Sequence, residues 1–335
     1  MKQITVIVCT YNRCRGLPNT LESIASSILP AGIEWEVLVV DNNSSDQTHQ
    51  VVDELSHRYP ERFRYLFEPR QGKSYALNAG VRAARGKICA FTDDDVLVEP
   101  TWLYHLTSML HSGEWAGAGG RTFPAREFVC PEWMSVTRPP ALGGPLCGTF
   151  DIGDIPGALP CPPYGANMAF RKDMFEKYGG FRLDVGPPPK KVQGEDTEFG
   201  FRLMLAGQLL FYEPSAIVRH PVLEERLSKK YFLKWMFTHG RAVVRLESER
   251  SPVQAIAPTH RRVANRVGHL SHLVVMRWMK TTDSKWRFWY KCAVWKTCGE
   301  LVELFSRLRT VSGSDQTEQV SEGITKATNP VRGEL

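Results

Sequence analysis

The sequence has no apolar run of the length that a transmembrane helix needs. Such a helix takes about 18 or more apolar residues, and the strongest C-terminal candidate, Leu273 to Met276, is soon followed by Arg277 and Lys280. The N-terminus lacks the basic region, apolar stretch and cleavage site of an export signal, because a β-rich run begins directly at Ile4. We therefore expect a cytoplasmic chain that does not cross a bilayer.

Paired cysteines and glycine-rich nucleotide motifs are missing as well. The eight cysteines include no C-x-x-C pair, so they are typical of reduced thiols rather than of a disulfide framework or a zinc site. Gly72-Lys73-Ser74 is not a Walker A motif, since Phe67 stands where that motif needs its first glycine. No G-x-G-x-x-G follows the first expected strand. These absences exclude P-loop enzymes and Rossmann dinucleotide enzymes.

The composition is that of a globular protein with a large core. The chain has 335 residues, of which 42% are hydrophobic and 23% charged, enough for one α/β domain of roughly 200–250 residues and an appendage. The net charge of +6 is unevenly distributed, with −5 over residues 1–225 and +11 over residues 226–335. The basic C-terminal part indicates a polyanion or an anionic membrane surface as a neighbour, or a basic helical face in solvent.

Apolar patterns predict strands and helices in alternation over the first 100 residues. Short apolar, β-branched runs indicate buried parallel strands, and apolar residues at helical spacing indicate the helices between them. This order predicts a doubly wound sheet with ligands at the carboxyl ends of its strands. We expect strands at 4–8, 35–40, 63–67 and 87–92 and helices at 17–28, 48–59 and 74–84.

The second half is less regular. Residues 120–165 are rich in proline and glycine and predict a long functional loop. Beyond residue 226 the pattern is mostly helical and basic, and from 311 to 335 the scarcity of apolar residues predicts a disordered tail. Between these parts we expect strands at 164–170, 208–212 and 216–219, helices at 172–178 and 195–206, and a stiff exposed connection at 186–191.

Carboxylates follow two of the expected strands. Asp93, Asp94 and Asp95 come directly after one strand, where three adjacent negative charges are tolerated most easily if Mg²⁺ or Mn²⁺ neutralises them together with substrate phosphates. The alternative is an acidic surface turn. Asp41 ends another strand, where its carboxylate would accept hydrogen bonds from a base or ribose, or would cap the next helix.

Three further segments carry candidate chemistry. Arg70 and Lys73 stand immediately before a helix, where backbone N–H groups and the helix dipole favour a phosphate. Asp196 opens another helix, either as a general base or as a first-turn acid that stabilises the dipole. His220 stands at a strand end, as a partly buried histidine or as a ligand for Mn²⁺.

Taken in this order, these segments resemble the family 2 glycosyltransferases of the GT-A fold, which move a sugar from a nucleotide-sugar to an acceptor with inversion. The resemblance implies an α/β fold of GT-A type, a doubly wound mixed sheet flanked by helices with a helical C-terminal extension. The matching segments are Val6 to Arg13, Val39 to Asp46, Gly72 to Gly80, Phe91 to Asp95, Gly165 to Asn167 with Gly179 to Phe181, and Gly194 to Asp196.

The resemblance also assigns roles to single residues. Asp196 would be the catalytic base that takes the proton of the attacking acceptor hydroxyl. Asp95 and His220 would hold Mn²⁺ or Mg²⁺, with Asp93 and Asp95 as the D-x-D pair, and Lys73 and Arg70 would help to neutralise the departing diphosphate. The nucleotide-sugar would be bound by Thr10, Tyr11, Arg13, Asp41, Arg70, Lys73, Asn78, Asp93 and Asp94.

The expected organisation is a catalytic domain over 1–222, a basic helical extension over 223–310 and the tail over 311–335. About 1–119 would form the nucleotide-binding half and 120–222 the acceptor half. The implied partners are a nucleotide-sugar, with UDP as the expected nucleotide, and a glycan or polyprenyl-linked acceptor. Peripheral contact with the inner face of the plasma membrane and a homodimer are left open, and no nucleic acid is expected.

Two other functions are left open by the residues alone. A sugar-phosphate nucleotidyltransferase uses a related sheet, but the glycine-rich, arginine-containing loop that such enzymes have after the first strand is missing. A non-catalytic carbohydrate- or lipid-binding protein on the same fold would have no need for the full set of acidic residues. The Q-x-x-R-W motif of processive relatives is also absent, which favours transfer of one sugar at a time.

Overall fold

A computed structural model describes residues 2–134, 149–185, 194–246, 259–279 and 282–327. The expected connection at 186–191 lies outside the described residues, as do 135–148 of the long loop and the last eight residues of the tail.

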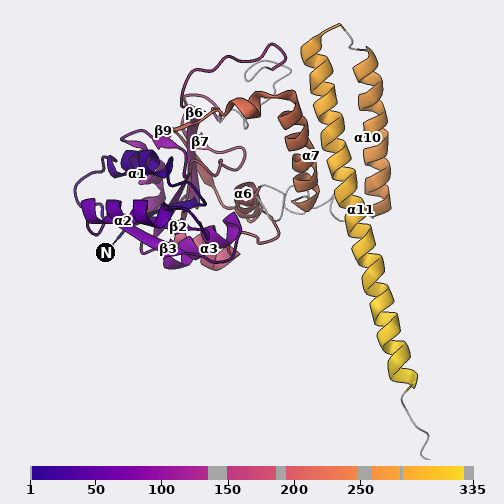
Figure 1. Ribbon diagram of the computed structural model, residues 1–335, viewed down its shortest axis with the longest axis horizontal. Helices are drawn as coiled ribbons and strands as arrows, with labels where there is room; N and C mark the ends of the chain where they lie inside the picture. The colour runs from indigo at the N-terminus through magenta and orange to yellow at the C-terminus, as the bar shows by residue number, and fades with distance from the viewer. Residues whose placement is uncertain (1, 135–148, 186–193, 247–258, 280–281, 328–335) are drawn as a thin grey trace, which may run out of the picture.

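A mixed sheet, of nine strands among the described residues, forms the centre of the body (Figure 1). Its strand order is β3-β2-β1-β4-β8-β6-β9-β5, with β7 paired to β9. The first four strands in this order are parallel, and β8 joins them antiparallel to β4. The predicted doubly wound α/β sheet is therefore confirmed. The strands are β1 (Ile4–Thr10), β2 (Trp35–Asp41), β3 (Phe63–Phe67), β4 (Ile88–Asp93), β5 (Leu97–Val98), β6 (Gly117–Pro124), β7 (Gly157–Ala158), β8 (Met168–Arg171) and β9 (Leu210–His220).

Helices cover both faces of the sheet because successive side chains of a strand point to opposite faces. On β1, Val6 and Val8 pack into one apolar cluster with α1, α2 and α4, whereas Ile7 packs into the other with α3, α5 and α6. Both faces are therefore buried, as the continuous apolar runs predicted. The helices of the body are α1 (Leu17–Ala25), α2 (Thr48–Arg58), α3 (Lys73–Ala83), α4 (Trp102–Ser108), η1 (Met109–Ser112), α5 (Lys172–Tyr178) and α6 (Glu195–Leu205).

The prediction of a loop from residue 120 onward is wrong for its first residues. Strand β6 continues to Pro124 and is held between β8 and β9. Its glycines gave no strand signal, but they are required by packing: a Cβ at Gly120 would lie 2.0 Å from the carbonyl oxygen of Ala216. The neighbouring strand β9 therefore explains Gly120.

The two short strands predicted at 208–212 and 216–219 are one strand, β9. Its pairing with β6 shifts register between Gly120 and Arg121, where the partner changes from Glu213 to Ile217. Pro214 lies in this irregularity, and since proline has no N–H to donate to a ladder, it is tolerated at such a bulge. The strand continues beyond it and ends at His220.

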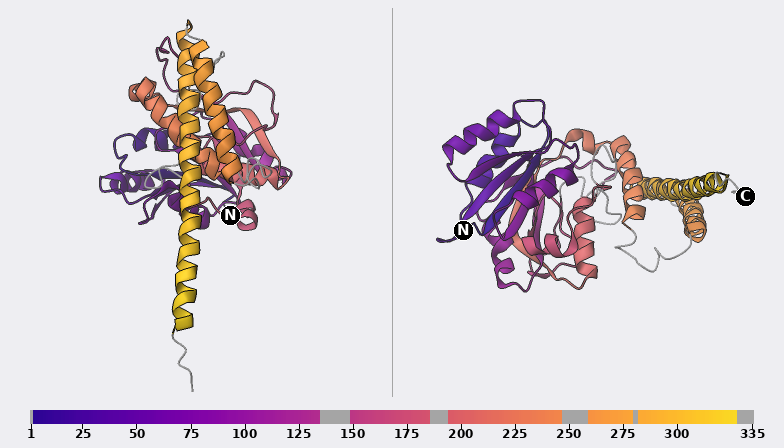
Figure 2. Two further views of the ribbon diagram at one scale, coloured as in Figure 1. Left: turned by 90° about the vertical axis from the view of Figure 1, so that its right-hand side faces the viewer. Right: turned by 90° about the horizontal axis from the view of Figure 1, so that it is seen from below.

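The C-terminal part forms what we call the helical arm, built from α7 (Lys229–Arg245), α10 (Thr259–Met279) and α11 (Ser284–Ala327). The short helix η3 (Glu224–Leu227) leads into it. Figure 2 shows the arm beside the sheet, with α11 extending well past it. The backbone of α11 is helical to Ala327, whereas composition predicted a disordered tail from 311; adding a residue to an existing helix costs far less than starting one. No helix in the described ranges is long and apolar enough to span a membrane.

Candidate functional site

The candidate site lies at the edge where β1, β2 and β4 end. The register places Thr10 opposite Asp41 and Cys9 opposite Asp93. Thr10 is buried at the end of β1, and the ring of Tyr11, the next residue, is 49% exposed at the rim. The three strand ends that the sequence singled out therefore meet at one edge of the sheet.

Lys73 links this edge to the helix that carries Asp196. Its Nζ lies 2.7 Å from Asp93 Oδ1 and 3.8 Å from Glu195 Oε1. Burial opposes its charged form, but Asp93 and Glu195 raise the pKa of Lys73 well above its ordinary value. Burial also raises the pKa of Glu195. Glu195, which the sequence did not single out, is thus a buried part of the site.

The other two aspartates face Arg13 and His220. Arg13 Nη2 lies 3.3 Å from Asp95 Oδ2, and its Nε lies 3.9 Å from Asp94 Oδ1. Burial raises the pKa of Asp94 to about 6, and the charges of Asp95 and Asp93 add to the rise. Burial is thus the main cause that disfavours the charged form of Asp94, and a cation bound beside it would favour that form.

Asp95 and His220 have the chemistry of a divalent metal site. His220 Nε2 lies 3.8 Å from Asp95 Oδ1, and its Nδ1 lies 2.8 Å from the carbonyl oxygen of Pro221. A carbonyl only accepts hydrogen bonds, so Nδ1 is the donor, and in a neutral imidazole the lone pair then lies on Nε2, on the side of Asp95.

The described residues contain no group of three or more His, Cys, Asp or Glu side chains placed to hold a metal ion by themselves. Mg²⁺ and related ions are commonly held by one or two carboxylates together with substrate phosphates and water. Asp95 and His220 therefore fit a metal that a bound diphosphate would complete.

Asp41 is engaged inside the fold. It is 2% exposed, and its carboxylate accepts hydrogen bonds from the backbone N–H of Ser44 and from the Tyr65 hydroxyl, at 2.9 and 2.8 Å. Burial and this hydrogen bond raise the pKa of Tyr65. Asp41 therefore holds the turn after β2 but does not cap α2, because the N–H of Thr48 at the start of that helix donates to Asp46 Oδ1 at 3.0 Å.

Asn42, which sequence reasoning missed, shapes the turn that carries Arg70 and Lys73. Its amide donates to the carbonyl oxygens of Glu68 and Arg70 at 3.2 and 2.7 Å, and its oxygen accepts from the N–H of Gly72 at 2.7 Å. Arg70 itself forms an ion pair with Glu68 at 2.8 Å. The adjacency of Asn42 to the end of β2 was the only sequence signal for this role.

Asp196 lies in the first turn of α6 with its carboxylate oriented by backbone amides. Its Oδ2 accepts from the N–H of Gly165 and its Oδ1 from the N–H of Thr197, both at 2.7 Å. Oδ1 also accepts from the Thr197 hydroxyl at 3.3 Å, so Oδ2 is the oxygen with a second lone pair to which a substrate hydroxyl can donate. The half-buried carboxylate is fixed in direction and open to one more donor.

Asn78, which we expected at the nucleotide-sugar, is engaged inside the fold. Its amide donates to the carbonyl oxygen of Phe181 at 2.7 Å, and its oxygen accepts from the N–H of the same residue at 2.8 Å. Both ends of the side chain are therefore used to hold the segment after α5. The structure brings together Thr10, Tyr11, Arg13, Lys73, the three aspartates, Asp196 and His220, and it places Asn78 and Asp41 in supporting positions.

Comparison with known proteins gives consistent matches. A sequence model described as glycosyl transferase family 2 matches residues 5–179. The chain is 30% identical over 255 residues to the succinoglycan biosynthesis protein ExoM of Rhizobium meliloti, covering 74% of this chain and 76% of that protein. It is 27% identical over 251 residues to a glucosyl-dolichyl phosphate glucuronosyltransferase of Haloferax volcanii, covering 71% of this chain and 75% of that protein.

Among solved structures, the chain resembles the mannosyltransferase PcManGT from Pyrobaculum calidifontis in complex with GDP-Man and Mn²⁺. The TM-score is 0.59 and the identity 18%, over 91% of this chain and 87% of the other. At this identity the likeness shows the fold, a GT-A sheet flanked by helices, and confirms the predicted fold class.

Proposed function

Because the chain belongs to glycosyl transferase family 2 and is a glycosyltransferase, we propose that it transfers one sugar from a nucleoside-diphosphate-sugar to an acceptor hydroxyl by direct displacement, with inversion at the anomeric carbon. The observation that carries this proposal is the Asp93–Lys73–Glu195 chain of contacts, which joins the edge of the sheet to the helix of Asp196. The family assignment also favours transfer over the nucleotidyltransferase and binding-protein alternatives.

One group of residues would act on the acceptor hydroxyl and another on the departing diphosphate. Asp196 would take the proton of the attacking hydroxyl, since backbone amides fix its direction and leave a lone pair free on Oδ2. Lys73 would place positive charge beside the departing diphosphate. Asp95 and His220 would hold Mn²⁺ or Mg²⁺, which when bound supplies further positive charge to that leaving group.

The donor and the pathway follow from relatives rather than from contacts. UDP is the first nucleotide to test, and GDP the second because PcManGT was solved with GDP-Man and Mn²⁺. The names of relatives refer to succinoglycan biosynthesis and to a dolichyl-linked sugar. We propose polysaccharide or lipid-linked glycan assembly, with a glycan or polyprenyl-linked acceptor on the cytoplasmic side of the membrane.

One end of the molecule suits such a membrane-held acceptor. The rings of Phe232 and Phe288 pack against Trp133 with centroids 5.1 and 4.7 Å from it, and Lys229 Nζ lies 5.6 Å from the Phe288 ring. The loop of 125–134, the C-terminal end of α10 and the N-terminal end of α11 lie at this same end in Figure 1 and in the left view of Figure 2. We call it the aromatic end.

The aromatic end also exposes apolar and basic side chains next to the site. Val129 is 89% exposed and Met279 72%. Lys230 at the start of α7 and Lys285 and Arg287 at the start of α11 are exposed as well. The loop is tied to the site, because the N–H of Ala125 donates to the carbonyl oxygen of His220 at 2.8 Å. Aromatic and basic side chains together favour an anionic membrane surface. We propose that this end contacts the membrane; a second copy of the chain is the alternative occupant.

The direct test of the transferase mechanism is Asp196→Asn. The variant keeps an oxygen for the backbone N–H groups but cannot take up the proton, so transfer should slow by about 10²–10⁴-fold while nucleotide binding by calorimetry stays unchanged. Asp53→Asn, an exposed carboxylate on α2, is the matched control and should transfer normally. Wild-type transfer by Asp196→Asn would remove Asp196 as the base.

A further inference from the structure

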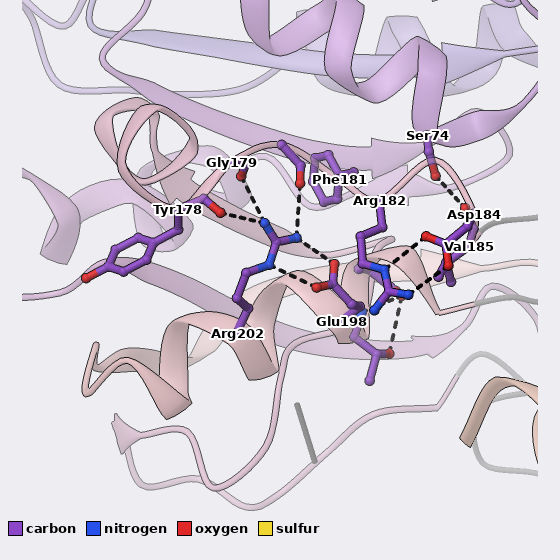
Figure 3. Close-up of polar contacts among 12 residues, drawn as sticks. Ser74, Tyr178, Gly179, Phe181, Arg182, Asp184, Val185, Glu198 and Arg202 are labelled. Carbon is purple, nitrogen blue, oxygen red and sulfur yellow. Dashed lines mark hydrogen bonds and ion pairs between the residues drawn. The ribbon is translucent and has the colours of Figure 1, made fainter. Parts of the chain in front are cut away.

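The segment from Tyr178 to Val185, which we call the connecting segment, lies between the two helices that carry the site. Ser74, which follows Lys73 on α3, donates from its Oγ to the carbonyl oxygen of Val185 at 2.7 Å (Figure 3). Asn78 of the same helix holds Phe181 through both ends of its amide. The donor side of the site is thus joined to this segment.

From the other side, α6 holds the start of the connecting segment. Arg202 donates to the carbonyl oxygens of Tyr178, Gly179 and Gly180 at 2.6, 3.3 and 3.0 Å. Its guanidinium also pairs at 2.6 Å with Glu198, whose side chain is fully buried in the first turns of α6 (Figure 3). Because Asp196 lies in that same first turn, the segment is fixed to the helix of the proposed base.

A third contact comes from the helical arm. Arg245, at the end of α7, donates from Nη1 to the carbonyl oxygen of Asp184 at 2.8 Å. Its Nε donates to Glu303 Oε1 of α11 at 2.6 Å, and Arg241 donates to Glu303 Oε2 at 2.9 Å. Glu303 is 5% exposed, so two arginines hold a buried carboxylate, and one of them also reaches the connecting segment.

The next residue of the arm touches the other approach to α6. Leu246 is 1% exposed and lies close to Gly194. A Cβ added at Gly194 would lie 3.1 Å from Leu246 Cδ1. Gly194 precedes Glu195 and Asp196 directly. The end of α7 therefore meets the chain at Asp184 and again at the residue that starts α6.

We propose that Arg245, held in place by Glu303, is a positioning residue for glycosyl transfer: it fastens the helical arm to the connecting segment and so sets where Asp196 stands relative to Lys73 and Asp93. The proposal rests on the proposed function, because it takes Asp196 as the base. Arg245, Glu303 and Asp184 lie beyond the matched family region, which ends at 179. A charged fork that bonds a carboxylate and a carbonyl together is a role that arginine fills better than lysine.

The experiment compares two arginines that share Glu303. Arg245→Gln loses the contact to Asp184. We expect its kcat to fall ten- to a hundredfold, because a displacement of about 1 Å at the base is enough for such a loss. KM and Kd for the nucleotide-sugar should stay unchanged. Arg241→Gln loses its bond to the same carboxylate, but within the described ranges no hydrogen bond joins Arg241 to the connecting segment. It should keep kcat within about twofold of wild type, a difference of less than 0.5 kcal/mol. Equal losses in the two variants, or none in Arg245→Gln, would overturn the proposal.

Two further measurements separate positioning from folding and from the identity of the base. Arg245→Lys keeps a cation beside Glu303 but cannot bond both groups, so it should fold with the wild-type Tm and still lose kcat. In an Asp196→Asn background, Arg245→Gln should cause little further loss, because a residue that acts only through the base has nothing left to position. Full additivity contradicts the role of Arg245, whereas normal transfer by Asp196→Asn alone contradicts the proposed function.

Discussion

Asp95 and His220 show how single residues from distant parts of the chain acquire a joint function. Asp95 follows β4 and His220 ends β9, so their proximity depends on the order of strands between them. From the residues alone the sequence left each of them open as a metal ligand, and only the family resemblance put the two together in one site. The tautomer that leaves Nε2 of His220 open comes from the carbonyl oxygen of Pro221, a neighbour along the chain.

We expect Asp95→Ala to lose the metal-dependent part of nucleotide binding. Calorimetry with UDP, GDP and dTDP, each with and without Mn²⁺, should show one nucleotide that binds wild-type protein more tightly with metal. In the variant this enhancement should fall by about tenfold to a hundredfold, because changes around a metal ligand commonly have that effect. Metal-enhanced binding that survives in Asp95→Ala would place the ion on other residues.

Glu36 is a buried carboxylate with a structural role, on a strand that the sequence presented as apolar. It accepts hydrogen bonds from the Thr5 hydroxyl, the Arg64 guanidinium and the N–H of Arg85. Burial alone would raise its pKa, but the Arg85 amide, Arg64 and Thr5 together bring the pKa below its ordinary value. The charged form is therefore the one that the folded protein favours.

This sign fixes the pH dependence of stability. Because the pKa is lower in the folded than in the unfolded chain, the contribution of Glu36 is complete above the unfolded value of about 4.3 and is lost as pH falls through the folded value. Glu36→Gln should lower the free energy of unfolding at pH 7 by about 2 kcal/mol and make it less sensitive to acid. Glu34 is an exposed neighbour, so Glu34→Gln should change neither the free energy of unfolding nor its dependence on pH. Urea unfolding at several pH values measures both.

At the scale of elements, the helical arm depends on backbone contact between two helices. Gly240 of α7 faces α11 so closely that a Cβ would lie 1.9 Å from the carbonyl oxygen of Lys296. Such contact allows Arg241 and Arg245 of α7 to reach Glu303 on α11. Apolar periodicity predicted that this region is helical, but not which helix faces which.

Gly240→Ala should destabilise the arm, because the added methyl group forces two helices apart at a cost of about 1–3 kcal/mol. Gly268→Ala on α10 is the matched control: nothing lies within 4 Å of the added Cβ, so alanine should be neutral or stabilising by up to about 1 kcal/mol. Chemical unfolding followed by circular dichroism measures both. Equal stability of the two variants would show that α7 and α11 are not packed in this way.

At the scale of the whole molecule, the acidic body and the basic C-terminal part are joined so that the aromatic end borders the site. The loop from Ala125 begins at the end of β6 beside His220, and Trp133 on that loop packs against α7 and α11. Glu127, Glu132 and Asp283 offset part of the positive charge there. Apolar side chains must therefore supply part of any attraction to a membrane.

We expect vesicles containing anionic lipid to bind the protein and shift its tryptophan emission to shorter wavelength, with weaker binding to zwitterionic vesicles. Met279→Glu should weaken binding by about tenfold or more, since a buried methionine contributes about 1.5–3 kcal/mol. Leu209→Glu changes a residue that is 50% exposed just before β9, at the opposite end of that strand from His220. This variant should bind vesicles as wild type does. If both variants bind vesicles equally weakly, or if the wild-type protein does not bind them, a second copy of the chain is the occupant of the aromatic end. Sedimentation would detect that dimer.

The sequence by itself determined the parallel strands β1 to β4 and the edge where Thr10, Asp41 and Asp93 meet. It could do so because strand and helix periods are local, and the carboxyl ends of parallel strands necessarily share an edge. The tertiary structure alone decided that β6 is a strand, that Asn78 holds Phe181, that Glu195 joins Lys73 and that Arg245 reaches Asp184. These contacts join residues far apart in the chain, and no local pattern encodes which distant group will complete a hydrogen bond or fill a space.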